Sequence, residues 1–167
     1  MFKQQAREHS HSRPVGLPDG SSVGELPTGT MQVLSVVEGL ATAKAGRTCI
    51  LLWRGVVNDA RFRLQRDAME QVVAGHPGDA VILCIIEPTS EPPPQALREA
   101  ASALLNQLAP RLRCVAYVIE GSGFRAAMIR GVLSSIELVR RSAYPARYFA
   151  TVADASAWIP VETGRRS

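Results

Sequence analysis

The segment Ala-Val-Ile-Leu-Cys-Ile-Ile at residues 80–86 constrains the fold of this chain more than any other feature. It is apolar throughout and lacks the alternation of apolar and polar residues that a half-exposed strand shows. Such a run is typical of a strand that is covered on both faces in the middle of a parallel sheet. Parallel strands are joined by long crossover connections, so helices are expected on both sides of this segment.

The residues before this strand predict two further strands and a helix. Two β-rich runs cover 31–39 and 47–55, and the Leu-Ala-Thr-Ala-Lys-Ala-Gly between them has the small residues of a hairpin connection. We therefore expect the two runs to pair antiparallel. A helix over 59–74 follows, capped by Asn58 or Asp59 and ended by Gly75.

The residues after 86 continue the alternation of helices and strands. We expect helices over 94–108 and 124–142, strands over 113–119 and 146–151, and a last helical turn capped by Asp154. The order ββαβαβαβα predicts an α/β fold with a mixed, largely parallel small sheet and right-handed crossovers. The apolar face of the longest helix is expected to comprise Phe124, Met128, Val132, Ile136 and Val139.

The length and the distribution of residue types indicate one domain. The chain has 167 residues, enough for one ordinary core. Residues 1–29 are rich in Gly, Pro, Ser and His and predict a flexible leader, followed by a folded domain over 30–160 and a flexible tail over 161–167. No apolar run reaches the roughly 20 residues of a membrane helix, and the start lacks a secretory signal, so we expect a cytoplasmic protein.

Cysteine positions and charge argue against two classes of protein. Cys49, Cys84 and Cys114 lie singly inside apolar runs, without a Cys-x-x-Cys pair, which indicates buried thiols and no zinc or disulfide framework. The net charge is +4, but the arginines are spread over many elements beside acidic residues. A nucleic-acid-binding protein would gather its basic residues on one face, so no nucleic acid is expected as a partner.

Two segments carry a family resemblance that spans about residues 31–159. The element order, the Trp53-Arg54-Gly55 triplet and the closing Phe-Ala-Thr-Val-Ala-Asp-Ala-Ser-Ala-Trp-Ile at 149–159 resemble STAS domains. The similarity is to a divergent bacterial branch, related to the sporulation anti-sigma-factor antagonist and to lipid-binding proteins of the same general shape. This resemblance implies a small sheet with helices packed mainly on one face, and a function through protein partners or a small apolar ligand.

The same resemblance directs attention to residues 87–94. Phospho-switched members of the family carry a serine in an Asp-Ser-Ser-Gly-like segment after the central strand, and this chain has Glu-Pro-Thr-Ser-Glu-Pro-Pro-Pro instead. Thr89 and Ser90 are still hydroxyls just before a helix N-terminus, where a phosphate is favoured by the helix dipole. Thr89, Ser90 and Gln95 are therefore candidates for partner binding or phosphorylation, and turn or capping roles explain the hydroxyls equally well.

A second candidate segment is the turn Gly121-Ser122-Gly123. With Phe124, Arg125 and Ala126 it fits G-x-G-x-x-A at a strand-to-helix junction, as in dinucleotide-binding sites. It belongs to a late βα unit, however, and the expected acid about 20 residues further on is missing. We regard Gly121, Ser122 and Gly123 as anion- or ligand-binding candidates, and a tight turn capped by Ser122 as the plain alternative.

Catalytic constellations are scarce. His76 is the one histidine outside the leader and lies in a turn, so no nucleophile–base arrangement can be assembled. Glu87 and Glu120 end neighbouring strands, but nothing in the sequence supplies an apolar pocket that would raise one pKa. We expect no enzyme, no cofactor and no metal.

Three functional hypotheses remain. The first is a regulatory protein–protein interaction module that uses the surface around Thr89, Ser90 and Gln95, with or without phosphorylation. The second is a carrier of a small apolar or lipid-like ligand, held between the helix over 124–142 and the sheet. The third is a nucleotide-binding protein that uses the Gly121–Gly123 turn.

Overall fold

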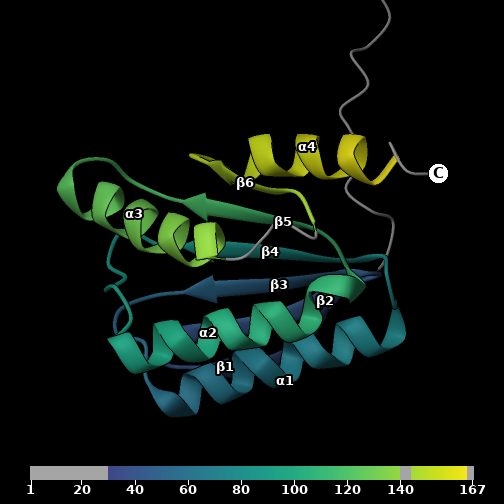
Figure 1. Cartoon of the computed structure of the whole chain (residues 1–167), viewed down its shortest axis with the longest axis horizontal. Coiled ribbons are helices and arrows are strands. Elements are labelled where there is room, and N and C mark those ends of the chain that lie inside the picture. Colours follow the sequence, from purple (N-terminus) through teal and green to yellow (C-terminus); the bar gives the residue numbers. More distant parts are fainter. Residues whose placement is uncertain (1–29, 140–143, 165–167) are drawn as a thin grey trace, which may run out of the picture.

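The computed structural model describes residues 30–139 and 144–164. They form one six-stranded sheet in which the strands lie in sequence order, from β1 at one edge to β6 at the other (Figure 1). The strands β3 to β6 are parallel to one another, and β1, β2 and β3 form an antiparallel meander. The α/β class and the mixed, largely parallel sheet are thus confirmed.

The meander contains a strand that the sequence analysis missed. The strand β2 (Leu40–Ala45) lies between β1 (Gln32–Val37) and β3 (Thr48–Trp53), pairing with both. The segment interpreted as a hairpin connection is therefore itself a strand, and the expected direct pairing of the two β-rich runs is wrong. Gly39 and Gly46, both at positive φ, form the tight turns at its two ends.

The parallel half of the sheet follows the sequence more closely. The helix α1 (Asp59–Gly75) begins after Asn58, whose side-chain oxygen accepts a hydrogen bond from the Arg61 amide at 3.0 Å. It leads to β4 (Ala80–Ile86), which is almost completely buried, as its continuous apolar run predicts. The helix α2 (Gln95–Leu108), a short 3-10 helix over Ala109–Arg111 and β5 (Leu112–Ile119) complete the next unit.

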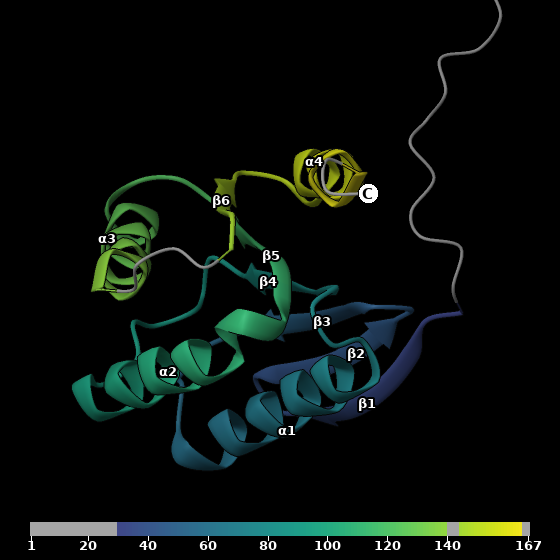
Figure 2. The same cartoon turned by 45° about the vertical axis from the view of Figure 1, so that its right-hand side comes forward.

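Helices cover the two faces of the sheet unequally. The helices α1, α2 and α3 (Phe124–Val139) lie on one face, while α4 (Val152–Gly164) lies on the other, beside β6 (Ala146–Phe149) (Figure 2). The larger core joins the first three helices to the sheet, and a smaller one joins α4 to β4 and β5. Packing mainly on one face is confirmed. None of the described helices is long and apolar enough to cross a membrane.

The two C-terminal helices differ from expectation in detail. In α3 the side chains of Ala126, Ile129 and Ile136 are buried, while Phe124 and Met128 of the expected apolar stripe are exposed. The buried stripe is therefore rotated about the helix axis relative to the predicted one.

The last helical turn expected at Asp154 is a full helix. Thr151 caps it, because its side-chain oxygen accepts a hydrogen bond from the Asp154 amide at 3.1 Å. Since α4 reaches Gly164, residues 161–164 of the predicted tail are helical. The predicted leader at 1–29, residues 140–142 of the longest predicted helix and the rest of the predicted tail, 165–167, lie outside the described residues.

Candidate functional site

The structure brings two of the candidate segments together. The strands β4 and β5 are parallel neighbours, so their carboxyl ends lie side by side. The loop that follows β4 therefore meets the turn that follows β5. A Cβ added to Gly121 would lie 3.2 Å from the Pro88 side chain. The Arg125 guanidinium donates a hydrogen bond to the Thr89 carbonyl oxygen at 3.4 Å. The turn and the loop thus form one continuous surface.

The two hydroxyl candidates of this loop have different environments. Ser90 is 2% exposed, and its hydroxyl donates to the Trp53 carbonyl oxygen at 2.9 Å. Thr89 is exposed, as is Gln95, whose side chain donates to Glu99 at 3.0 Å. A kinase can therefore reach Thr89 directly, whereas Ser90 first has to leave its site. Phosphorylation of either residue stays a prediction.

An ion pair that the sequence analysis missed closes the base of this loop. Glu87 accepts two hydrogen bonds from Arg54, at 2.5 Å from Nε and 2.9 Å from Nη2. The hydrogen bonds from Arg54 hold the pKa of the Glu87 carboxyl below its ordinary value, opposite to the raised pKa that an acid catalyst of a carboxylate pair needs. The signal was present in the sequence, since both residues directly follow the strands β3 and β4.

The Gly121–Gly123 turn is exposed and leads into α3. Gly121 and Gly123 both have positive φ, at 85° and 87°, and the Gly123 carbonyl oxygen accepts the amide of Ala127 at 3.1 Å. The close approach of Gly121 to Pro88 supplies a packing reason for this glycine that needs no nucleotide.

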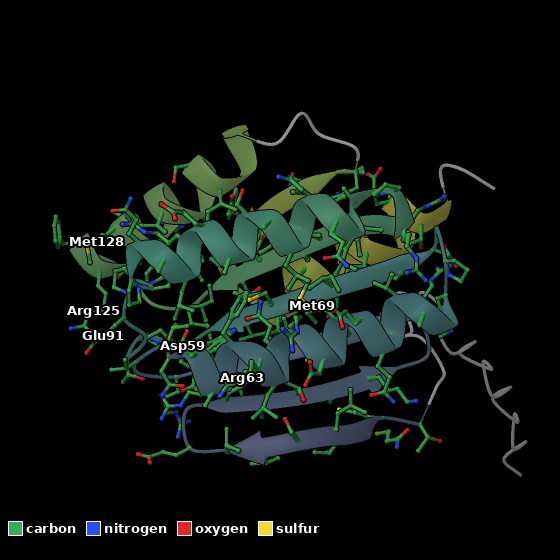
Figure 3. All side chains as sticks on the ribbon, turned by 60° about the horizontal axis from the view of Figure 1, so that its bottom comes forward. Asp59, Arg63, Met69, Glu91, Arg125 and Met128 are labelled. Carbon is green, nitrogen blue, oxygen red and sulfur yellow. The ribbon has the colours of Figure 1, made fainter. Side chains whose placement is uncertain are left out.

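Two apolar side chains next to this turn were not among the candidates. Phe124 is 83% exposed and Met128 39% exposed, and they lie one helical turn apart on α3. Figure 3 shows Met128, Arg125 and Glu91 at the same end of the molecule. The sequence analysis assigned Phe124 and Met128 to the core because they fit an apolar stripe at helical spacing.

An apolar cavity lies behind this surface, between the helices α1, α2 and α3 and the sheet. Its volume is about 110 Å3, room for roughly three or four water-sized groups. The lining is mostly aliphatic and aromatic and includes Phe62, Met69, Ala101 and Ile129; Met69 lies between α1 and α2 in Figure 3. The cavity occupies the place expected for an apolar ligand, but it is smaller than the roughly 300 Å3 of ordinary ligand pockets.

Two polar groups at the cavity wall, the Trp53 indole and the Ser90 hydroxyl, are already engaged. The Trp53 Nε1 donates to the Gln65 side-chain oxygen at 2.9 Å, and Ser90 is bonded to the Trp53 carbonyl as described. The polar contacts of a ligand would have to replace these bonds, whereas apolar contacts would not. The cavity therefore fits an apolar group best.

The cysteines are placed as the sequence predicts, since Cys49, Cys84 and Cys114 are all buried. Burial raises the pKa of each thiol to about 12. Across residues 30–139 and 144–164, no group of three or more His, Cys, Asp or Glu side chains has the arrangement of a metal site.

No protein-family model matches the chain, and no curated protein matches it significantly.

Proposed function

We propose that this protein is a non-enzymatic, cytoplasmic interaction module of the STAS type that binds another protein at the loop surface. The loop surface is the area formed by Thr89, Gly121, Phe124 and Met128. Exposure of Phe124 beside this loop is the observation that carries the proposal. Aromatic and methionine side chains are enriched where proteins bind one another.

The position of Arg125 supports regulation at the same surface. Its guanidinium reaches the carbonyl of Thr89, so a phosphate on the exposed Thr89 hydroxyl would have a cation nearby for a charge-assisted hydrogen bond. The phosphate would also add up to two negative charges to the loop surface. Such a modification would alter which partner the loop surface accepts.

Native mass spectrometry of the tagged protein, isolated gently from its own host, tests this proposal. We expect one protein to accompany the wild type, and the same protein to be lost with Phe124→Asp. Ser134→Asp is the matched control, because Ser134 is exposed on the same helix away from the turn. Retention of the partner by Phe124→Asp would remove the loop surface from the proposal, and a bare monomer for the wild type would count against it as well.

A second candidate function is carriage of a small apolar or lipid-like ligand, which needs the apolar cavity to be larger than the structure shows it. The described part of α3 buries the apolar side chains of Ala126, Ile129 and Ile136 against the rest of the core. An outward movement of this helix would enlarge the cavity beyond its resting volume of about 110 Å3. The same mass spectra test this function, because a carrier would show a small-molecule adduct.

A cavity-filling variant separates the carrier from the interaction module. Ala101 lines the cavity from α2, and Ala101→Leu adds three carbon atoms to it. A carrier would lose its small-molecule adduct in this variant and keep it in Ser134→Asp. An unchanged adduct in Ala101→Leu would place the ligand elsewhere.

A further inference from the structure

A second surface lies at the opposite edge of the sheet from β1, in the groove between β6 and α4. The groove has a volume of about 590 Å3, within the usual range of ligand sites. Its walls include Arg147 and Phe149 from β6 and Asp154, Ala157, Trp158 and Val161 from α4. It is separate from the loop surface, because α4 covers the other face of the sheet from α3 (Figure 2).

The helix side of this groove is an apolar stripe that the described residues cover only in part. Ala157, Trp158 and Val161 recur at helical spacing; Ala157 is exposed and Val161 is 53% exposed, while Trp158 is half-buried and its ring centre lies 5.5 Å from that of Phe149. The opposite side of α4, with Ala155 and Ile159, is buried against the sheet. A helix that is apolar on both sides is normally covered on both sides. The outer stripe of α4 is therefore the kind of surface that a partner covers.

The strand side of the groove is the last strand of the described sheet. The amide of Val115 on β5 donates to the carbonyl oxygen of Pro145 at 2.9 Å. This bond shows which backbone groups of β6 point toward β5. Because backbone groups alternate in direction along a strand, the N–H and C=O of Ala146 point away from β5. An extended segment can pair with backbone groups of this kind by adding a strand to the sheet.

Charge further defines what the groove can accept. Arg147 is exposed, with its guanidinium carbon 5.5 Å from the centre of the Phe149 ring, and it makes no ion pair within the described residues. The Asp154 carboxylate also lines the groove and keeps its negative charge while accepting the Thr151 hydroxyl at 2.7 Å, so the groove carries charges of both signs. On the strand side of the groove Arg147 offers a cation to the occupant, and a carboxylate is the group that pairs with a guanidinium best.

We propose that the groove between β6 and α4 binds an extended peptide segment of a partner protein, with apolar side chains at alternate positions and a carboxylate that pairs with Arg147. Alternate side chains of an added strand point to one face, so every second residue would meet the stripe of Ala157, Trp158 and Val161. A second copy of this chain fits less well, since pairing across a two-fold axis through β6 would bring two Arg147 guanidinium groups to one short strand pair.

Selection of random linear peptides displayed on phage against the immobilised full chain tests this proposal. We expect the enriched peptides to alternate apolar residues and to share an Asp or Glu. Ala157→Arg should abolish their binding, and Ala153→Arg, which is exposed on α4 but outside the groove, should leave it unchanged. Circular dichroism of both variants checks that α4 remains folded.

A charge reversal gives the sharper result. With Arg147→Glu, the affinity of an enriched acidic peptide should fall roughly 10- to 100-fold, as expected for a lost hydrogen bond between charged groups. A repeated selection on this variant should enrich Lys or Arg in place of the acid. Hydrogen exchange at the Ala146 amide should slow when the peptide binds the wild type.

The remaining outcomes would overturn the proposal. These are a selection without enriched peptides, peptides whose binding survives Ala157→Arg, and a wild type that sediments as a dimer while Ala157→Arg sediments as a monomer. The last result would assign the groove to a second copy. Phe124→Asp should bind the enriched peptides normally, so failure at the loop surface and failure at this groove are distinguishable.

Discussion

Arg54 and Glu87 join the ends of β3 and β4 through two parallel hydrogen bonds, of 2.5 Å and 2.9 Å. The pair lies directly below the loop that carries Thr89. Glu87 is the more shielded partner, since 18% of its side chain is exposed against 66% for Arg54. Two-bond guanidinium–carboxylate geometry fixes orientation as well as distance, so this pair sets the direction in which the loop leaves the sheet.

Glu87→Gln should make stability less sensitive to acid. The hydrogen bonds from Arg54 lower the pKa of Glu87 in the folded protein, so the stabilisation is complete above the ordinary pKa of a glutamate and is lost as the pH falls through the lowered pKa. We expect the variant to melt at most about 2–4 °C below the wild type at neutral pH, and the difference to vanish in acid. Thermal melts of both proteins from neutral pH into acid measure this difference. Glu99→Gln, exposed and without an ion pair in the described structure, should melt in parallel with the wild type.

A negative charge should destabilise the protein at Ser90 and have little effect on its stability at Thr89. Ser90→Ala should cost about 1 kcal/mol, because it removes one buried hydrogen bond to Trp53. Ser90→Glu should cost about 3 kcal/mol or more, since it forces a charge into a buried site. Thr89→Glu should stay within about 0.5 kcal/mol of the wild type. Urea unfolding measures all three, and a well-folded Ser90→Glu would show that the loop opens easily.

Gly39 and Gly46 form a matched pair of turn positions. Both have positive φ, but a Cβ on Gly39 would lie 2.7 Å from the Arg54 carbonyl oxygen, while a Cβ on Gly46 meets nothing within 4 Å. We expect Gly46→Ala to cost about 1 kcal/mol from backbone strain alone. Gly39→Ala should cost about 3 kcal/mol or more, because overpacking adds to that strain. If denaturant unfolding gives both variants the same loss of unfolding free energy, the β1–β2 turn can shift to accommodate the added methyl group.

The cysteines should be inert until the protein unfolds. With pKa values of about 12, only about one thiol in ten thousand is ionised at pH 8, and the thiolate is the reactive form. We expect a disulfide reagent to label none of the three cysteines of the chain in native buffer and all three in guanidinium chloride. Rapid labelling of one thiol in native buffer would reveal local opening around that strand.

The parts of the fold that the sequence predicts are those in which a local signal and the tertiary environment agree. The strand at 80–86 is predicted at its observed bounds, because burial on both faces leaves a continuous apolar run. The strand β2 was missed because Leu-Ala-Thr-Ala-Lys-Ala has little intrinsic preference for a strand. Its structure depends on pairing with β1 and β3 on both sides, which no local pattern reports.

In the candidate site, too, some features follow from sequence patterns and others depend on the tertiary environment. Pro88 and Gly121 lie close together because they follow neighbouring parallel strands, whose carboxyl ends lie side by side. The order of elements already implied this approach. The burial of Ser90 does not follow from the sequence, because it depends on how the loop folds back to the Trp53 carbonyl. The exposure of Phe124 was equally hidden, since a one-residue rotation of the buried stripe moves it from core to surface.

Because one face of the sheet carries three helices and the other carries only α4, the two faces have cores of different size. The side chains that α4 buries meet β4, β5 and β6, so its release would uncover the small second core and leave the packing of α1, α2 and α3 in place. Sub-global openings of this kind occur where a unit buries little apolar surface. We therefore expect the C-terminal segment to unfold and refold separately from the rest of the domain, and an occupant of its groove to make such openings rarer.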